Sequence, residues 1–431
     1  MMAVVLTLLQ LIGVPTTLIP PPFSHTLGFN RISPFYISMV LGNDFRIDNP
    51  QGLACAKMKE EEDTTTWRDD ALLTLFAVNS GTGQILYNIK LHRLRVFGTQ
   101  GSGIGQFKNP YGIACNEAGD VFVADRDNNR LVRLRYTNGE LRWVAVVDSN
   151  LNLPYDVTMD SKGYVYVTDN QLGVVAYSPE GTRQTVCSGL ENPTAIAILD
   201  HSAQFNETGQ DLFVVVDRSG MRINQLSLSG EIKRTIDCRR IGLDSADFAY
   251  CAFDRHGNLY VTDRLNSQIH IFDPALKYIT SFGRGPSGSA DEPVFNSPRG
   301  IAIGRKFGQV FISEADGGQY YLIALDGYLI GCFPEVFNSE RPGTTIALYL
   351  TQRAEIVIEI TDTLKNLVRN LTPVHQQGPG EVLIAWDGRN NQGEFVPAGE
   401  YTINITLRPT YSHPRYTMKK QLTTRVRKLP G

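Results

Sequence analysis

The sequence predicts an all-β protein, a six-bladed β-propeller followed by a small β-sandwich. A pattern of short strands and turns recurs between residues 44 and 334, and a different strand pattern begins after Phe333. The chain also contains 39 glycines, 18 tyrosines and 20 phenylalanines, which suits short strands joined by tight turns. Together these features are typical of repeated antiparallel sheets.

Length and charge narrow the class of protein further. A chain of 431 residues is too long for one ordinary core, so we expect more than one domain. The formal net charge of −3 gives no overall attraction to nucleic acid or to an anionic membrane. The six cysteines form no C-x-x-C pair, which leaves a zinc ribbon or a thioredoxin-type site unsupported.

Residues 1–34 are expected to be a lead-in to the first domain, with a signal or anchor segment as the alternative. The apolar start, MMAVVLTLLQLIGV, is short for a bilayer span. No Lys or Arg precedes it and no A-x-A site follows, although both are features of a signal peptide. No later stretch is apolar enough to predict a transmembrane span.

Residues 35–334 contain six copies of one repeating unit. Two clear copies are NPYGIACNEAGDVFVADRDNNRLVRL (109–134) and DFAYCAFDRHGNLYVTDRLNSQIHIF (247–272). Each copy supplies an apolar strand, usually after a proline, then a β-branched and aromatic strand, an alternating strand and a connecting stretch. Four strands per copy, at a spacing of roughly 40–50 residues, predict the blades of a propeller.

The strand that closes the ring is left open by the sequence. FYISMVLG (35–42) has the composition of an outermost strand and is expected to pair with the last blade. YLIGCF (328–333) competes for the same place.

The repeat resembles the NHL family of β-propellers over roughly residues 44–334. The resemblance is carried by the Pro-x-Gly-Ile-Ala entries at 110–114 and 298–302, by Gly119, Gly163 and Gly257 before the second strand, and by Asp125, Asp169, Asp217 and Asp263 at its end. Two copies depart from the pattern, because Ala195 and Tyr250 stand where the entry glycine is expected.

The stretch VFVADRDNNRLVRL (121–134) also resembles the start of a calcium loop. An EF-hand loop needs Gly at its sixth position and Glu at its twelfth, whereas counting from Asp125 this chain has Arg130 and Tyr136. Across the copies only the first polar residue recurs, and Asp127 does not. We therefore interpret Asp125 and its counterparts as turn residues whose carboxylates accept backbone N–H groups.

Residues 335–431 predict a second all-β domain. TIALYL, EIVIEI, EVLIAW and YTINITL alternate between apolar and polar residues, and Trp386 is expected in the core. WDGRNNQGEFVPAGEYTINI resembles the Ig-like domain first known from the flagellar hook-capping protein, over roughly residues 336–408, although the turn TDTLKNLVR lacks an expected glycine. The resemblance implies an Ig-like β-sandwich in a bacterial protein that is extracellular or in the cell envelope. The basic residues 409–431 are expected to form a last strand and a solvated tail.

The candidate ligand site lies where the blades meet the central channel. In an NHL-like propeller, the entries to the first strands and the turns after the second strands share one face. The first set places Gln51, Tyr111, Tyr155, Thr194, Ala249 and Arg299 at the channel mouth, and the second adds Arg126, Arg218 and Arg264. Tyrosines and arginines contribute much binding energy in interfaces, so this face is expected to bind a protein, peptide or glycan.

A metal-dependent enzyme, of the lyase or the lactonase/esterase type, is the alternative interpretation. The propeller lyase that cleaves hydroxyglycine peptides has a channel histidine directly after a blade-entry proline, and none of the six entry positions here is a histidine. A calcium-dependent lactonase would need converging oxygen ligands, and only Asp156 and Asp247 are available. We therefore expect no metal and no cofactor.

Two further features stay secondary. Cys55 and Cys115 occupy equivalent first-strand positions, where two core residues are favoured over a disulfide or metal pair. The polar insertions at 57–73 and 201–210 join first to second strands and are expected on the opposite face, where they can contact a partner. The sequence thus predicts a non-catalytic binding or scaffold protein with no affinity for nucleic acid, and it leaves the oligomeric state open.

Overall fold

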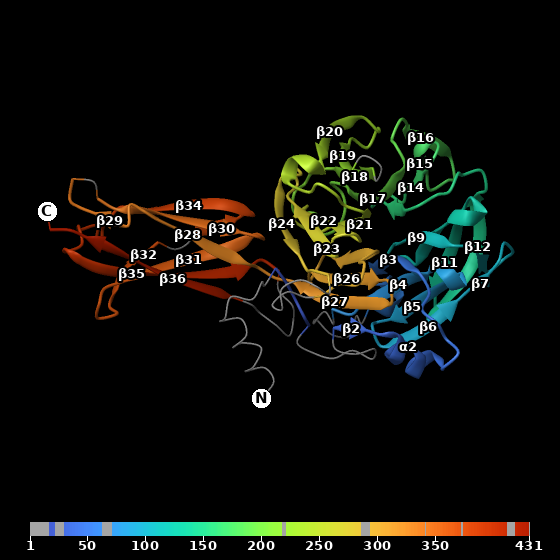
Figure 1. Cartoon of the computed structure of the whole chain (residues 1–431), viewed down its shortest axis with the longest axis horizontal. Helices are drawn as coiled ribbons and strands as arrows, with labels where there is room; N and C mark the ends of the chain where they lie inside the picture. The colour runs from blue at the N-terminus through green and yellow to red at the C-terminus, as the bar shows by residue number, and fades with distance from the viewer. Residues whose placement is uncertain are drawn as a thin grey trace. The chain divides into compact units, whose positions relative to one another are not determined.

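The computed structural model describes residues 17–21, 30–62, 71–217, 221–285, 294–340, 342–371, 374–411 and 419–430. The chain divides into two compact units (Figure 1). One unit is Pro20–Leu322; the other begins at Ile323 and includes the short strand β1 (Leu18–Ile19). Residues 1–16 and 22–29 of the expected lead-in lie outside the described residues.

The described part of Pro20–Leu322 contains six sheets in which successive strands pair antiparallel. The first three sheets are β3 (Pro50–Ala56), β4 (Thr74–Asn79), β5 (Gln84–Ile89) and β6 (Arg93–Phe97); β9 (Pro110–Cys115), β10 (Asp120–Asp125), β11 (Arg130–Thr137) and β12 (Glu140–Asp148); and β13 (Val157–Met159), β14 (Val165–Asp169), β15 (Gly173–Tyr177) and β16 (Arg183–Cys187). The next three are β17 (Pro193–Leu199), β18 (Leu212–Asp217), β19 (Arg222–Leu226) and β20 (Ile232–Asp237); β21 (Phe248–Phe253), β22 (Leu259–Asp263), β23 (Gln268–Phe272) and β24 (Tyr278–Phe282); and β25 (Ile301–Gly304), β26 (Gln309–Glu314), β27 (Gly317–Ile323) and β2 (Arg31–Ile32).

Short elements connect these sheets. They are α2 (Pro34–Leu41), the paired strands β7 (Thr99–Gln100) and β8 (Gln106–Phe107), and the 3-10 turns η2 (Lys59–Glu61), η3 (Ser80–Thr82), η4 (Arg126–Asn128) and η5 (Cys238–Ile241). The second strand of each later sheet is buried on both faces; β14, β18, β22 and β26 have only buried residues. Their β-branched and aromatic side chains fill the space between neighbouring sheets, which explains why these strands are almost continuously apolar.

The first strands of the six sheets contact one another in cyclic order: β3, β9, β13, β17, β21, β25 and again β3. The approach is close at the entry glycine, because a Cβ added to Gly112 would lie 2.5 Å from the Cα of Asp156. This explains the Pro-x-Gly entry in physical terms. The arrangement is all-β and propeller-like, in agreement with the predicted class.

The acidic residue at the end of the second strand accepts hydrogen bonds within the following turn, as predicted. It also accepts a hydrogen bond from the segment that leads into the first strand. Asp169 accepts hydrogen bonds from the backbone N–H groups of Gln171 (2.9 Å) and Leu172 (2.7 Å), as predicted. It also accepts from the N–H of Asn152 (2.6 Å), two residues before Pro154, the entry proline of the same sheet. Asp125 holds the N–H of Lys108 in the same way (2.8 Å). These carboxylates therefore fix the segment that leads into each first strand.

Both sequence candidates for the closing strand were wrong. Residues 34–41 form the helix α2, with Pro34 in its first turn, because proline fits there and the following apolar residues do not alternate. A strand that pairs with β27, β2, lies just before the helix, with Arg31 opposite Gln319 and Ile32 opposite Gly318. Residues 328–333 belong to β28 (Gly327–Phe333), which pairs with a strand of the C-terminal unit.

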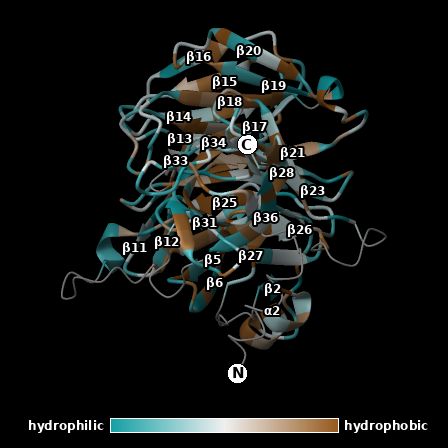
Figure 2. Ribbon diagram, turned by 90° about the vertical axis from the view of Figure 1, so that its left-hand side faces the viewer, coloured by the Kyte–Doolittle hydropathy of each residue, from teal (hydrophilic) through white to brown (hydrophobic). Residues whose placement is uncertain are grey.

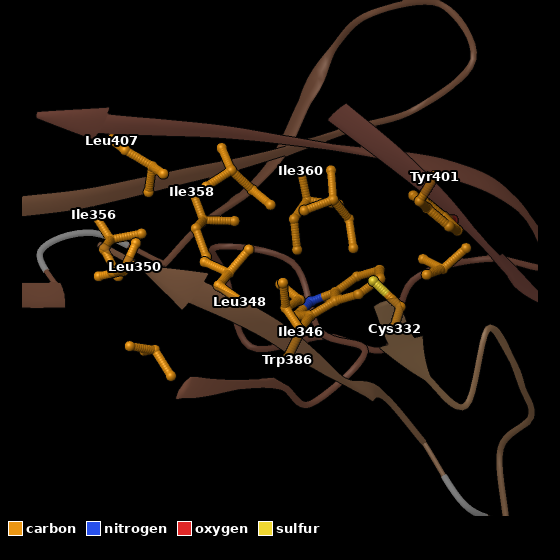
Figure 3. Packing of buried hydrophobic residues seen from close by; sticks show 14 of the residues in the cluster. Cys332, Ile346, Leu348, Leu350, Ile356, Ile358, Ile360, Trp386, Tyr401 and Leu407 are labelled. Carbon is orange, nitrogen blue, oxygen red and sulfur yellow. The ribbon is translucent and has the colours of Figure 1, made fainter. Parts of the chain in front are cut away.

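The C-terminal unit contains two sheets around one core. One sheet is β28, β30 (Thr344–Leu350) and β34 (Gly380–Trp386); the other is β29 (Val336–Phe337), β36 (Lys420–Lys428), β35 (Gly399–Pro409), β31 (Ala354–Thr361), β32 (Leu367–Asn370) and β33 (Val374–Gln377). Trp386 is buried between Phe337 and Tyr401, and its indole N–H donates to the carbonyl of Arg389 (2.9 Å). Figure 3 shows this tryptophan among the apolar side chains of both sheets, as the sequence predicts.

Candidate functional site

The predicted entry residues meet at one end of the ring of first strands, but most of them are buried. Gln51 and Thr194 are each 1% exposed, and Tyr155 is 7% exposed. Tyr111, Arg126, Arg264 and Arg299 are partly exposed instead. The mouth expected to be an open platform therefore has a buried layer beneath a partly exposed one.

An aromatic row crosses this mouth. The ring of Tyr111 packs edge-on against Tyr155, with centroids 5.0 Å apart, and Tyr155 packs against Tyr250 at 5.5 Å. The guanidinium of Arg126 lies 4.9 Å from the centroid of the Tyr111 ring, within cation–π range. The row thus extends from a partly exposed arginine to the buried Tyr250.

Hydrogen bonds continue the row to the last sheet. The Tyr250 hydroxyl donates to Gln51 Oε1 (3.3 Å), and Gln51 Nε2 donates to Asn49 Oδ1 (3.0 Å). Arg299 Nη1 donates to the same Asn49 oxygen and to the carbonyl of Pro50 (3.0 Å). Side chains from five sheets, or from the segments that enter them, are therefore held in one network. We call Tyr111, Tyr155, Tyr250, Arg126, Arg264 and Arg299 the tyrosine–arginine cluster.

The cluster concentrates positive charge. Burial lowers the pKa of Arg299, and the nearby positive charge of Arg264 lowers it further. Arg264 is paired with Asp247, its Nη2 lying 2.7 Å from Oδ2. Burial opposes the charge of Arg264, but interactions with Tyr155 and Asp247 raise its pKa above the usual value. Both guanidiniums are charged at neutral pH, and the carboxylate of Asp247 balances the charge of Arg264.

Two described positions, Thr194 and Ala249, do not join the network. Thr194 donates to the carbonyl of Val216 (3.4 Å), and its own carbonyl accepts from Thr168 Oγ1 (2.7 Å), so it ties two sheets together. Ala249 is fully buried. Arg218 lies outside the described residues.

Two members of the network were missed by the sequence reading. Tyr250 occupies an entry-glycine position, and this departure from the repeat was the available signal. Copies that follow the pattern have glycine at this position, and glycine has no side chain. Tyr250 instead places its side chain in the channel. Asn49 gave no such signal. Its role depends on Arg299, which lies 250 residues away in the sequence.

A cavity of about 140 Å³ follows the first strands below the cluster. Asp156 and Tyr250 line it, as do Cys55, Cys115 and Arg305 nearer its other end. Burial raises the pKa of Asp156 to about 7, although its carboxylate accepts the N–H groups of Val157 (2.9 Å) and Ile196 (3.1 Å). These two bonds connect β13 to β17, which gives Asp156 a structural role in the ring.

The opposite mouth is wider. A polar hollow of about 890 Å³ is lined by turns that join first to second strands, including Glu117, Lys162 and Lys306. Described residues of both insertions, among them Lys59 and Gln204, line it too. The insertions therefore lie on the predicted face, except that residues 63–70 are outside the described part of the chain.

The described residues contain no group of three or more His, Cys, Asp or Glu side chains placed to hold a metal ion. The six cysteines are free thiols in the structure, Cys55 and Cys115 included. None of the helices in the described ranges has the length and apolarity needed to cross a bilayer.

Comparison with known proteins places both parts of the chain. Residues 336–409 match the FlgD Ig-like domain family. The chain is 23% identical over 265 residues to NHL repeat-containing protein 3 of Homo sapiens, covering 56% of this chain and 71% of that protein. Among solved structures, a streptogramin B lyase is 15% identical with a TM-score of 0.45, covering 65% of this chain and 95% of the other. A putative gluconolactonase is 13% identical with a TM-score of 0.45, covering 64% and 89%.

Proposed function

We propose that this chain is a non-catalytic binding protein built on a six-bladed propeller. Each of the six sheets would form one blade, and the cyclic contacts of their first strands support this arrangement. The tyrosine–arginine cluster would bind a protein, peptide or glycan ligand. The similarity to an NHL repeat-containing protein is consistent with this proposal and does not name a ligand.

The main support is the state of the guanidiniums in the cluster. The Nε–H groups of Arg126 and Arg299 are buried and have no hydrogen-bond partner among the described residues. Arg264 and Arg299 also repel each other. A carboxylate placed between them would accept hydrogen bonds and relieve the repulsion. We therefore propose a ligand with acidic groups, such as an acidic peptide segment or a uronic-acid glycan.

The proposed location is outside the cytoplasm, at or beyond a bacterial cell surface. The FlgD Ig-like match supports this because such modules accompany secreted bacterial proteins. The Ig-like unit would act as a spacer or attachment module. Fractionation of the native host, with detection of the chain outside the cytoplasm, would test this part.

Titration calorimetry tests the ligand site directly. The probes are an oligoglutamate peptide and an oligogalacturonate, each with a neutral counterpart, oligoglutamine or a neutral oligosaccharide. We expect the acidic probe that binds to lose about tenfold or more in affinity in Arg299→Ala, because a charge-assisted hydrogen bond contributes roughly 1.5–3 kcal/mol. Arg142→Ala is the matched control, since this exposed arginine pairs with Glu140 on β12.

Two outcomes would contradict the proposal. If Arg126→Ala and Arg299→Ala both bind the acidic probes as the parent chain does, the cluster is not the site. If the purified protein contains a stoichiometric tightly bound metal and hydrolyses or cleaves lactone, ester or peptide substrates, the function is catalytic. Metal analysis alongside the titration separates these cases.

A further inference from the structure

A cavity of about 100 Å³ lies between the first and the last sheet of the Pro20–Leu322 unit. Strands β3, β4, β5 and β6 line it on one side, β26 and β27 line it on the other, and Ile37 of α2 adds a third side. Figure 2 shows α2 beside β5, β6 and β27, and Figure 1 shows the same neighbours from another direction. No residue of the tyrosine–arginine cluster lines this cavity, so among the described residues it is a separate site.

The lining of the cavity is mainly apolar. Leucines from three strands of the first sheet face it, namely Leu53, Leu75 and Leu94, and the last sheet contributes the aromatic rings of Phe311 and Tyr320. Walls of this kind attract the apolar part of a ligand, because contact with them removes apolar surface from water.

Asn88 on β5 is a buried polar residue within this apolar lining. It is 6% exposed, and it lies directly opposite Leu75 on β4 and Leu94 on β6. Its Oδ1 is buried and has no hydrogen-bond partner among the described residues. An unpaired buried acceptor destabilises the folded state, so a partner from outside the chain would relieve a real cost.

Other polar side chains of the lining already have partners. Asn79 Oδ1 accepts the N–H of Asp48 (2.7 Å), and Gln319 Nε2 donates to the carbonyl of Val294 (2.8 Å). Ser313 Oγ donates to a backbone carbonyl of β3 (2.6 Å). The unmet hydrogen-bonding capacity is therefore concentrated at Asn88.

We propose that this cavity binds a compact, uncharged, apolar molecule that carries one hydroxyl group. The apolar part would contact Leu75, Leu94 and Phe311, and the hydroxyl would bond to the carboxamide of Asn88. A hydroxyl both donates and accepts hydrogen bonds, so it suits either orientation of the carboxamide. A charged ligand is disfavoured, because apolar walls would remove its hydration without compensation.

The size of the cavity limits the ligand further. An apolar cavity of roughly 150 Å³ holds benzene, so about 100 Å³ suits a molecule of about five heavy atoms. Water is a weaker occupant, because a buried water makes about three hydrogen bonds and the walls on both sides of Asn88 are leucines.

Saturation-transfer NMR titrations of the full chain test this inference with 1-butanol and 1-chlorobutane. The two probes have the same number of heavy atoms, and only the alcohol carries a hydroxyl. We expect the parent chain to bind 1-butanol about fivefold or more tighter, because the chloride leaves Asn88 unpaired. In Asn88→Leu the preference for the alcohol should disappear. The melting temperature of this variant should not fall, because an apolar side chain of similar size replaces an unpaired acceptor.

A second variant tests the place of binding. Ala77 on β4 lines the cavity, so Ala77→Leu fills part of it and should weaken the binding of both probes about fivefold or more.

Asn224→Leu is the matched control. Asn224 lies on β19, the third strand of its sheet as Asn88 is of the first, and is 3% exposed. Its Oδ1 accepts a hydrogen bond from Thr235 Oγ1 (2.8 Å). This control should keep the preference for 1-butanol and should melt at a lower temperature, because it loses a hydrogen bond.

Four outcomes would overturn the inference. They are that neither probe binds the parent chain, that the two probes bind it equally, that Asn88→Leu keeps the preference for the alcohol, and that Ala77→Leu binds both probes as the parent does.

Discussion

Replacing Asp125 by alanine should destabilise the N-terminal unit strongly, while the same change at Asp127 should not. The Asp125 side chain is fully buried and accepts hydrogen bonds from Lys108 N–H (2.8 Å), Asn128 Nδ2 (2.8 Å) and Arg130 Nε (2.7 Å). The substitution leaves three donors without their acceptor. At about 1 kcal/mol or more for each orphaned donor, the free energy of unfolding should fall by about 3 kcal/mol. Loss of one partner of a buried ion pair gives a similar range, about 3–5 kcal/mol.

The lower end of that range is expected here. Burial raises the pKa of Asp125, which means that keeping its carboxylate charged in the folded state costs free energy. The alanine variant does not have this cost, and its absence offsets part of the loss. Asp127 is the control, since it lies two residues later in the same turn and its side chain is 26% exposed. Its bonds to Arg126 (2.9 Å) and Asn109 (2.6 Å) are partly solvated and should contribute under about 1 kcal/mol.

Urea unfolding followed by tryptophan fluorescence provides the measurement; Trp143 is one of the three tryptophans of the chain. Arg130, the partner of Asp125, lies 5.2 Å from the centroid of the Trp143 ring, so this tryptophan reports on the region that changes. The experiment is repeated with added calcium. Equal loss of stability in the two variants would refute the turn interpretation. Stabilisation of the parent by calcium that both substitutions abolish would restore the calcium-loop interpretation.

Three further outcomes follow from other buried groups. The pKa of Asp156 is raised to about 7, above the roughly 3.9 of the unfolded chain, so the folded state holds more protons between these values. The parent should lose up to about 4 kcal/mol relative to Asp156→Asn as pH rises from 4 to 7, measured by unfolding at each pH; a constant difference would contradict this. Burial raises the pKa of Cys55 to about 12, so alkylation by iodoacetamide at pH 8 should be far slower than in urea, and equal rates would disprove the shift. Trp386→Ala should destabilise the C-terminal unit by about 3–5 kcal/mol in calorimetry, whereas Leu383→Ala, at a 63% exposed position, should change little.

Much of the architecture was predictable because its causes are local. Every copy of the repeat contains alternating apolar residues, β-branched strands and glycine-containing turns. The residue ranges of the strands could therefore be predicted before the strands with which they pair were known. The turn role of Asp169 was predictable for the same reason, since the two backbone N–H groups that donate to its carboxylate lie within three residues. Its second bond, from the N–H of Asn152, comes from the segment that leads into the first strand of the same sheet, 17 residues earlier, and was not predicted.

The candidate site was only partly predictable. The entry positions of Tyr111 and Arg299 followed from the repeat, and both residues lie in the cluster. The solvent exposure of these residues could not be predicted from the sequence. A repeat pattern indicates that a residue lies at the channel mouth, but it does not indicate which other residues cover it. Gln51 is buried since Tyr250, Asn49 and the second strand of the last sheet, through Ser313, close around it.

The sequence by itself determined the all-β class, the repeating unit and the turn residues; it placed the change of pattern near residue 334, whereas the second unit begins at Ile323. These depend on the conformational preferences of neighbouring residues, which act over a few positions. Tertiary structure alone decided that residues 34–41 form a helix, that β28 pairs with the C-terminal sheet, and that Arg299 bonds to Asn49 across 250 residues. A short apolar segment is about equally compatible with a helix and with a strand. The part of the fold against which the segment packs therefore decides which of these conformations it adopts.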